Sequence, residues 1–147
     1  MIYPLAYSTW GKEEVDAIQK VIDTDMYTMG SHVKQFEQEF AELFNSPNAV
    51  MVNSGSSANL LMLSLLKWKY KLTGDIIVPV VGWATTYFPI VQNGFKINFV
   101  DVDPNTWNID VTKIEQAITP NTVAIMPVNL LGNSCDYKAI KEICFKH

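Results

Sequence analysis

The strongest structural signal in the chain is Val50-Met-Val-Asn-Ser-Gly-Ser-Ser-Ala-Asn-Leu-Leu-Met-Leu-Ser-Leu-Leu66. Its pattern predicts a short apolar strand at 49–52, a small polar turn, and a helix from near Ser56 to about Lys71. The helix is apolar almost all round, so we expect it to be buried, with its N-terminus facing a crevice rather than bulk water.

The turn ahead of this helix is a candidate anion site. Gly55 can take a backbone conformation closed to other residues, and Ser56 and Ser57 place hydroxyls beside unpaired backbone N–H groups. Such helix starts bind phosphate, because the unpaired N–H groups and the helix dipole both favour negative charge. Serine is also a common helix cap, so an ordinary capped core helix explains the turn alone equally well.

Elements of both kinds alternate along the rest of the chain. Continuous apolar strands between helices indicate a parallel sheet with helices on both faces, a three-layer α/β/α arrangement within one domain. Ligands bind beyond the carboxyl ends of the strands in such sheets, so the loops at 53–57, 81–86 and 129–134 are expected to line a site. Beyond 49–52, the predicted strands are 75–80, 95–100 and 122–128. The other predicted helices are 12–23, a helix capped by Ser31 and reaching Phe44, one after Gly82-Trp83 that ends near Asn93, one capped by Asp110, and 136–146, while 2–11 looks extended.

Composition narrows the class of protein. The 147 residues are 48% hydrophobic and carry a net charge of −4, which suits a soluble globular domain and argues against nucleic-acid binding. No apolar run is long enough to cross a membrane, and 1–4 lacks a signal-peptide pattern, so we expect a cytoplasmic protein. The two cysteines and two histidines are too few and too far apart to predict a disulfide framework or a metal site.

The turn Asn53-Ser-Gly-Ser-Ser-Ala-Asn-Leu-Leu61 resembles the phosphate-binding turn of the pyridoxal-phosphate (PLP) sugar aminotransferases, the DegT/DnrJ/EryC1/StrS family. Further matches follow in the family's order over essentially the whole chain. They are Tyr27-Thr-Met-Gly30 ahead of Val33-Lys-Gln-Phe-Glu-Gln-Glu-Phe40, Gly82-Trp-Ala-Thr-Thr86, Phe99-Val-Asp-Val-Asp103 and Asn129-Leu-Leu-Gly-Asn133. The resemblance implies the large domain of the fold type I PLP-dependent transferases, of which 1–147 would be the N-terminal portion, and a homodimer.

It also implies roles for individual residues. The PLP phosphate would be held by Gly55, Ser56 and Ser57, the pyridine ring would stack on Trp83, Asn129 would reach cofactor or substrate, and Met29 and Gly30 would contact a sugar nucleotide. Each residue has a structural alternative. Trp83 could fill the core, the Met29 loop could pack against it, and Asn129 could only shape its turn. Asp101 and Asp103, which invite an acid–base interpretation, are better explained as the end of a strand that hydrogen-bonds loop backbone.

Transamination also requires a lysine that forms a Schiff base with PLP and a carboxylate on the pyridinium nitrogen. In the resembled family both lie beyond the position of His147, and no lysine here matches the motif. We therefore expect a fragment or truncated product, inactive alone, of an enzyme that transfers an amino group from glutamate to a keto-sugar nucleotide. A minority of the family replaces the lysine with histidine and removes a sugar hydroxyl instead, although Trp83 favours the aminotransferases. The remaining alternative is a non-catalytic module that binds a phosphate ligand or a partner.

Overall fold

The computed structural model describes residues 7–147, so part of the predicted extended segment 2–11 lies outside it. The chain forms two compact units, one ending at Met51 and the other running from Val52 to His147. The single-domain organisation expected from the sequence stays a prediction.

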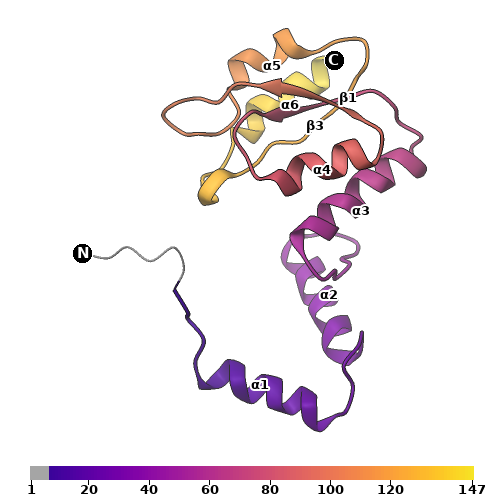
Figure 1. The fold of residues 1–147 in the computed structure, drawn as a ribbon, viewed down its shortest axis with the longest axis vertical. Helices are drawn as coiled ribbons and strands as arrows, with labels where there is room; N and C mark the ends of the chain where they lie inside the picture. The colour runs from indigo at the N-terminus through magenta and orange to yellow at the C-terminus, as the bar shows by residue number, and fades with distance from the viewer. Residues whose placement is uncertain (1–6) are drawn as a thin grey trace. The chain divides into compact units, whose positions relative to one another are not determined.

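The first unit contains two helices, α1 (Lys12–Asp23) and α2 (Ser31–Leu43), both close to their predicted bounds (Figure 1). Helix α1 begins after Gly11, whose N–H donates to Glu14 Oε2 at 2.7 Å. The N-cap of α2 is Gly30 and not the predicted Ser31, which is the first helical residue. The predicted apolar stripe is present on α2, but Phe36 and Phe40 remain 47% and 44% exposed within the described residues.

The strand predicted at 49–52 does not form. Val50 and Met51 are 66% and 44% exposed, and the Met51 N–H donates to the side chain of Glu37 on α2, at 2.7 Å from Oε1. A strand is stabilised by hydrogen bonds to a neighbouring strand, and the described part of the chain provides no neighbour for this segment. Its apolar sequence therefore gives a connection without regular secondary structure.

The second unit is built on a three-stranded parallel sheet of β1 (Asp75–Pro79), β2 (Lys96–Val100) and β3 (Thr122–Ile125), in the order β2-β1-β3. The central strand is the most buried, since Ile76, Ile77 and Val78 have no exposed surface. A run of β-branched residues covered on both faces is what a central parallel strand requires. The predicted parallel sheet is confirmed, although β3 ends three residues before the predicted end at Val128.

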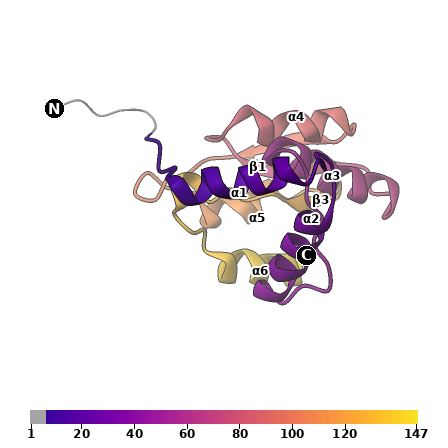
Figure 2. The ribbon, with the colours of Figure 1, turned by 90° about the horizontal axis from the view of Figure 1, so that it is seen from below.

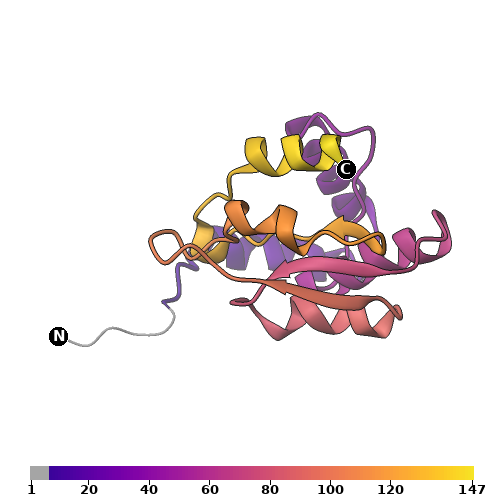
Figure 3. The same ribbon diagram turned by 90° about the horizontal axis from the view of Figure 1, so that it is seen from above.

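Helices cover both faces of this sheet. Helix α4 (Ala84–Gln92) lies on one face, while α5 (Val111–Ala117) and α6 (Tyr137–Lys146) lie on the other (Figures 2 and 3). Helix α3 (Gly55–Trp68) joins α4, because its Leu63 packs with Ile90 against the sheet. The predicted three-layer α/β/α arrangement is thus confirmed. Asp110 caps α5 as expected, whereas Asp136, predicted as the first residue of the last helix, is the N-cap of α6.

Helix α3 is less buried than its composition predicts. Only Leu63, 1% exposed, is fully buried, while Leu61 and Leu65 are 51% and 46% exposed. Composition indicates that a helix can be covered on all sides, but only neighbouring elements determine which side is covered. Within the second unit, α3 packs by one face.

A hydrogen bond between α3 and α4 compensates for a proline inside α4. Pro89 has no N–H, so it cannot donate to the Thr85 carbonyl one turn earlier. The Asn59 side chain on α3 donates to that carbonyl instead, with Nδ2 3.2 Å from the Thr85 oxygen. Further along both helices, Ser64 Oγ donates to Asn93 Oδ1 at 3.0 Å. The start of α3 is therefore held against the start of α4.

Candidate functional site

The first turn of α3 forms the candidate anion site. Its N-cap is Ser54, whose Oγ accepts the Ser57 N–H at 3.2 Å and donates to Ser57 Oγ at 3.2 Å. Among residues 7–147, no hydrogen-bond partner faces the N–H groups of Gly55 and Ser56. Gly55 takes no positive φ, so its expected special backbone conformation is wrong; a Cβ there would meet no atom within 4 Å. What Gly55 provides is an open approach to these N–H groups.

This turn fits a phosphate group. Two unpaired N–H groups at the positive end of a 14-residue helix attract an anion, and the neighbouring hydroxyls can donate to its oxygens. A groove of about 200 Å³ opens beside the turn and is lined by Ser56 and Ser57 from α3 and by Thr85, Phe88 and Gln92 from α4. The turn itself follows the connection from Met51 and not a strand, in contrast to the prediction for 53–57.

The loop after β1 presents Trp83. Trp83 is the N-cap of α4 and is 75% exposed, so it fills no core within the second unit. The two ends of this loop are tied together, because Tyr87 Oη on α4 donates to the Pro79 carbonyl at the end of β1 at 2.9 Å. Burial raises the pKa of Tyr87. A Cβ on Gly82 would collide with Tyr87 Oη, so any other residue there would have to displace that hydroxyl from the Pro79 carbonyl. The sequence alone does not reveal that Gly82 faces the Tyr87 hydroxyl, which explains the glycine.

The loop after β3 carries Asn129. Its Oδ1 accepts two hydrogen bonds, from the Cys135 N–H at 2.9 Å and from Tyr137 Oη at 3.0 Å. Asn129 therefore shapes its loop, as the structural alternative predicts. Asn129 is an exposed residue, and its Nδ2 has no hydrogen-bond partner in the described part of the chain, so the amide hydrogens can serve a ligand. Between Asn129 and Cys135 the backbone forms the short 3-10 helix η1 (Leu130–Gly132).

Sequence reasoning missed Asn108, which joins the loop after β2 to the loop after β3. It is only 4% exposed, and its amide bonds to the backbone of the loop after β3 at three points. Asparagine near a turn is usually a surface residue, so nothing in the sequence distinguishes Asn108 from its neighbours.

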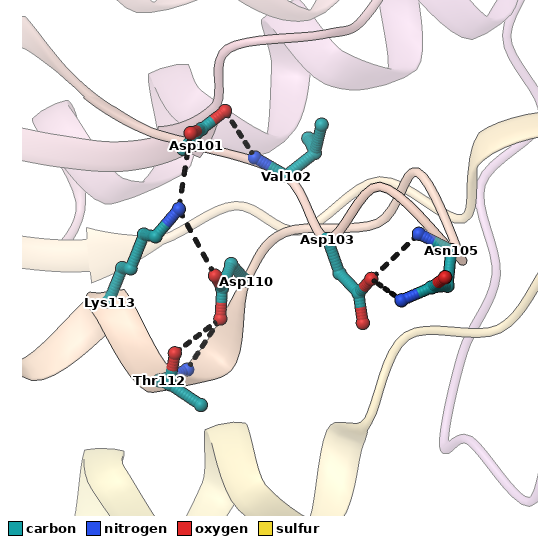
Figure 4. A network of polar contacts seen from close by, with 7 residues as sticks. All are labelled: Asp101, Val102, Asp103, Asn105, Asp110, Thr112 and Lys113. Atoms are coloured by element: carbon teal, nitrogen blue, oxygen red, sulfur yellow. Dashed lines mark hydrogen bonds and ion pairs between the residues drawn. The ribbon is translucent and has the colours of Figure 1, made fainter.

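The two aspartates after β2 have structural contacts (Figure 4). Asp101 accepts the Val102 N–H at 2.9 Å and lies 3.1 Å from Lys113 Nζ, and both contacts lower the pKa of Asp101. Asp103 accepts from the backbone and side-chain nitrogens of Asn105 at 2.7 and 3.0 Å. The prediction that this pair fixes loop backbone is confirmed.

The structure brings some predicted residues together. Ser56 and Ser57 share their groove with the α4 turn that Trp83 caps, and the Trp83 and Asn129 loops follow neighbouring parallel strands, whose carboxyl ends lie at one edge of the sheet. Met29 and Gly30 belong to the first unit. There, Gly30 lines a hollow of about 610 Å³ and Met29 is 67% exposed. The ligand roles of all seven predicted residues remain predictions.

Metal sites and membrane-spanning helices are absent from residues 7–147. No three side chains of His, Cys, Asp or Glu gather there in a way that could hold a metal ion. None of the helices in that range combines the length and hydrophobicity needed to cross a membrane.

Comparison with known proteins gives consistent matches along the chain. A sequence profile of the DegT/DnrJ/EryC1/StrS aminotransferase family matches residues 8–147. A GDP-4-keto-6-deoxy-D-mannose 3-dehydratase from Yersinia pseudotuberculosis is 53% identical over 145 residues, which cover 96% of this chain and 37% of the relative. The chain thus spans little more than a third of that relative's length.

Solved structures agree with this result. An E. coli GDP-4-keto-6-deoxy-D-mannose-3-dehydratase with bound hydrated PLP superposes with a TM-score of 0.91 at 49% identity, covering 98% of this chain and 38% of that one. A sugar aminotransferase from Micromonospora echinospora superposes with a TM-score of 0.89 at 27% identity, covering 99% of this chain and 39% of that one.

Proposed function

Because the chain belongs to the DegT/DnrJ/EryC1/StrS family, whose members use PLP, we propose that it is the N-terminal portion of a sugar 3-dehydratase. The whole protein would remove the 3-hydroxyl group from a GDP-4-keto-6-deoxy sugar. The observation that carries this proposal is the 53% identity over 145 residues to a dehydratase with that substrate in its name. The sugar aminotransferase that superposes equally well is only 27% identical. The dehydratase alternative thus has more support than the aminotransferase expected first.

Residues of this chain would bind the PLP phosphate and cover one face of the pyridine ring. The N–H groups of Gly55 and Ser56 and the Ser57 hydroxyl would bind the phosphate, and the exposed Trp83 ring would stack on the pyridine. The Asn129 amide would donate to an oxygen of cofactor or substrate. Once bound, PLP provides the electron sink that sugar deoxygenation requires.

Transfer of an amino group to the same sugar is the second candidate function. It is supported by the family description and by the superposition on sugar aminotransferases. The resemblance implies that a histidine or a lysine at the Schiff-base position decides between the two reactions. Glutamate would supply nitrogen in both, and a homodimer would carry out either.

The experiment that separates them uses protein expressed from the complete reading frame. The protein is incubated with PLP, nitrogen-labelled glutamate and GDP-4-keto-6-deoxymannose, and the sugar is analysed by mass spectrometry. We expect a product that has lost one oxygen and kept its ketone, with the label released as ammonia. Label incorporated into the sugar would show the aminotransferase reaction, and an unchanged sugar would refute both.

A pair of variants tests the cofactor contacts without any sugar. Replacing Trp83→Ala should weaken PLP binding by roughly two- to tenfold, because ring stacking contributes about 0.5–1.5 kcal/mol. The matched control is Trp68→Ala, since Trp68 is 76% exposed, against 75% for Trp83, but lies at the far end of α3. Equal PLP affinity in the two variants would refute the stacking role of Trp83.

A further inference from the structure

We propose that Asn108 is a positioning residue, which holds the loop 129–135 so that Asn129 presents its amide hydrogens to PLP. This inference rests on the proposed function, because that function gives Asn129 its PLP or substrate contact. Asn108 itself touches no ligand in this scheme and acts through Asn129.

Both ends of the buried Asn108 amide have hydrogen-bond partners. Its Nδ2 donates to the Asn133 carbonyl at 3.1 Å and to the Ser134 carbonyl at 2.9 Å, while its Oδ1 accepts the Leu130 N–H at 3.3 Å. All three partners lie in the loop after β3, 22 to 26 residues further along the chain. A side-chain amide that is 4% exposed and paired at both its nitrogen and its oxygen favours one arrangement of its partners.

The loop that Asn108 holds contains a strained backbone conformation. Leu131 has φ 53° and Gly132 has φ 83°, so a left-handed leucine stands inside the segment that Asn108 holds. A leucine avoids this conformation unless its surroundings enforce it. Asn133 adds a second tie between the two loops, because its Nδ2 donates to the Thr106 carbonyl at 3.0 Å.

The Asn129 amide has a fixed orientation. Its Oδ1 accepts from the Cys135 N–H in the loop and from Tyr137 Oη at the start of α6, so both lone pairs of that oxygen are engaged. The two Nδ2 hydrogens remain for a ligand. Asn129 is thereby fixed as a donor, and the group it would bind is an oxygen acceptor on PLP. Cys135 follows Ser134 directly, so a shift of the backbone that Asn108 holds would move the group that orients Asn129.

The test is a double-mutant cycle on PLP affinity, measured by fluorescence titration of the protein expressed from the complete reading frame. Asn108→Ala should weaken PLP binding by about tenfold, the loss expected for one well-oriented hydrogen bond. In an Asn129→Ala background the same change should alter PLP affinity by less than about twofold, because its target is already absent. The thermal midpoint of the cofactor-free protein should fall with Asn108→Ala in both backgrounds, since the loop is loosened in each.

Asn98→Ala is the matched control. Its side chain donates to the Ala117 carbonyl at 2.6 Å and joins β2 to α5 without contacting the loop after β3. It should lower the thermal midpoint and leave PLP affinity unchanged. If Asn108→Ala does not fold, the exposed Asn133→Ala takes its place, with an expected loss of about threefold that again disappears in the Asn129→Ala background.

Two outcomes would overturn the proposal. One is an equal loss of PLP affinity with and without Asn129, which would mean that Asn108 supports the fold in general. The other is unchanged PLP affinity in a folded Asn108 or Asn133 variant. The cycle uses no sugar, so its result is independent of the reaction. A protein that aminates the sugar would refute the dehydratase proposal and leave a non-additive cycle standing.

Discussion

Replacing Leu63→Ala in the 147-residue chain should destabilise the second unit far more than replacing Leu61→Ala on the same helix. Leu63 is 1% exposed and packs with Ile76, Val78 and Ile90, whereas Leu61 is 51% exposed. Alanine is an equally good helix former at both positions, so helix propensity cancels from the comparison. The difference then reports which face of α3 is packed.

The expected sizes follow from burial. Truncating a fully enclosed leucine costs about 3 kcal/mol, because the lost transfer free energy adds to that of a cavity that closes only in part. Leu61 keeps half of its surface in water, so its truncation should cost roughly 1 kcal/mol or less. For a domain of about 100 residues, 3 kcal/mol lowers the unfolding midpoint by roughly 12–24 °C.

The assay is urea unfolding followed by circular dichroism, repeated at several protein concentrations. The concentration series shows whether self-association buries the exposed face of α3. Equal costs for Leu63→Ala and Leu61→Ala at every concentration would refute the one-sided packing. A loss of unfolding free energy below about 1 kcal/mol for Leu63→Ala would also refute it, since truncating an enclosed leucine costs more than that.

Three other predictions concern single side chains. Ser54→Ala removes the N-cap of α3 and should lower the free energy of unfolding by about 1 kcal/mol in urea titrations. Native protein should react with a thiol reagent at the exposed Cys144 and not at Cys135 until it unfolds, because burial raises the pKa of the Cys135 thiol. The Thr112 hydroxyl bonded to Asp110 lowers the pKa of that carboxylate, so its stabilisation is present above the unfolded value of about 3.9 and is lost as pH falls through the lower folded value. Acid titrations of unfolding free energy should therefore be shallower below about pH 4 in Asp110→Asn than in the natural chain.

Each of these predictions has a contrary result. Ser56→Ala is the control for the cap, because Ser56 follows Gly55 in the first turn and caps nothing; equal losses for the two serines would contradict the assignment of Ser54. Rapid labelling of both thiols in folded protein would contradict the burial of Cys135. Identical acid profiles for the natural chain and Asp110→Asn would show that Asp110 contributes no pH-dependent stability.

The sequence predicts the second unit well where each element carries its own signal. Residues 75–79 form a strand because β-branched residues run without interruption to Pro79, and α5 and α6 begin where Asp110 and Asp136 cap them. Prediction fails at 49–52, where an apolar run has the composition of a strand but finds no strand to pair with among residues 7–147. Local sequence contains no information on the partner.

In the candidate site, too, the sequence predicts residues marked by local patterns and misses those placed by tertiary contacts. The serine turn and Trp83 are visible because short local patterns mark them, and the structure places both at helix starts. Asn108 bonds to the backbone of the loop after β3, and the Tyr87 hydroxyl bonds to the Pro79 carbonyl at the end of β1. Both roles depend on tertiary contacts that the local sequence does not show. The direction of the Asn129 amide is likewise fixed by Cys135 and Tyr137, which no spacing rule connects to it.

The hydrogen bond from Asn59 to the Thr85 carbonyl has a consequence for how this chain can change over time. Asn59 supplies a donor to a carbonyl that lacks its usual helical donor, because Pro89 has no N–H. A residue with an N–H at 89 would restore the helical donor, so position 59 could then vary. Loss of Asn59 alone would leave the Thr85 carbonyl without a hydrogen-bond donor. We therefore expect positions 59 and 89 to covary during evolution, with proline tolerated at 89 where an amide or a similar donor stands at 59.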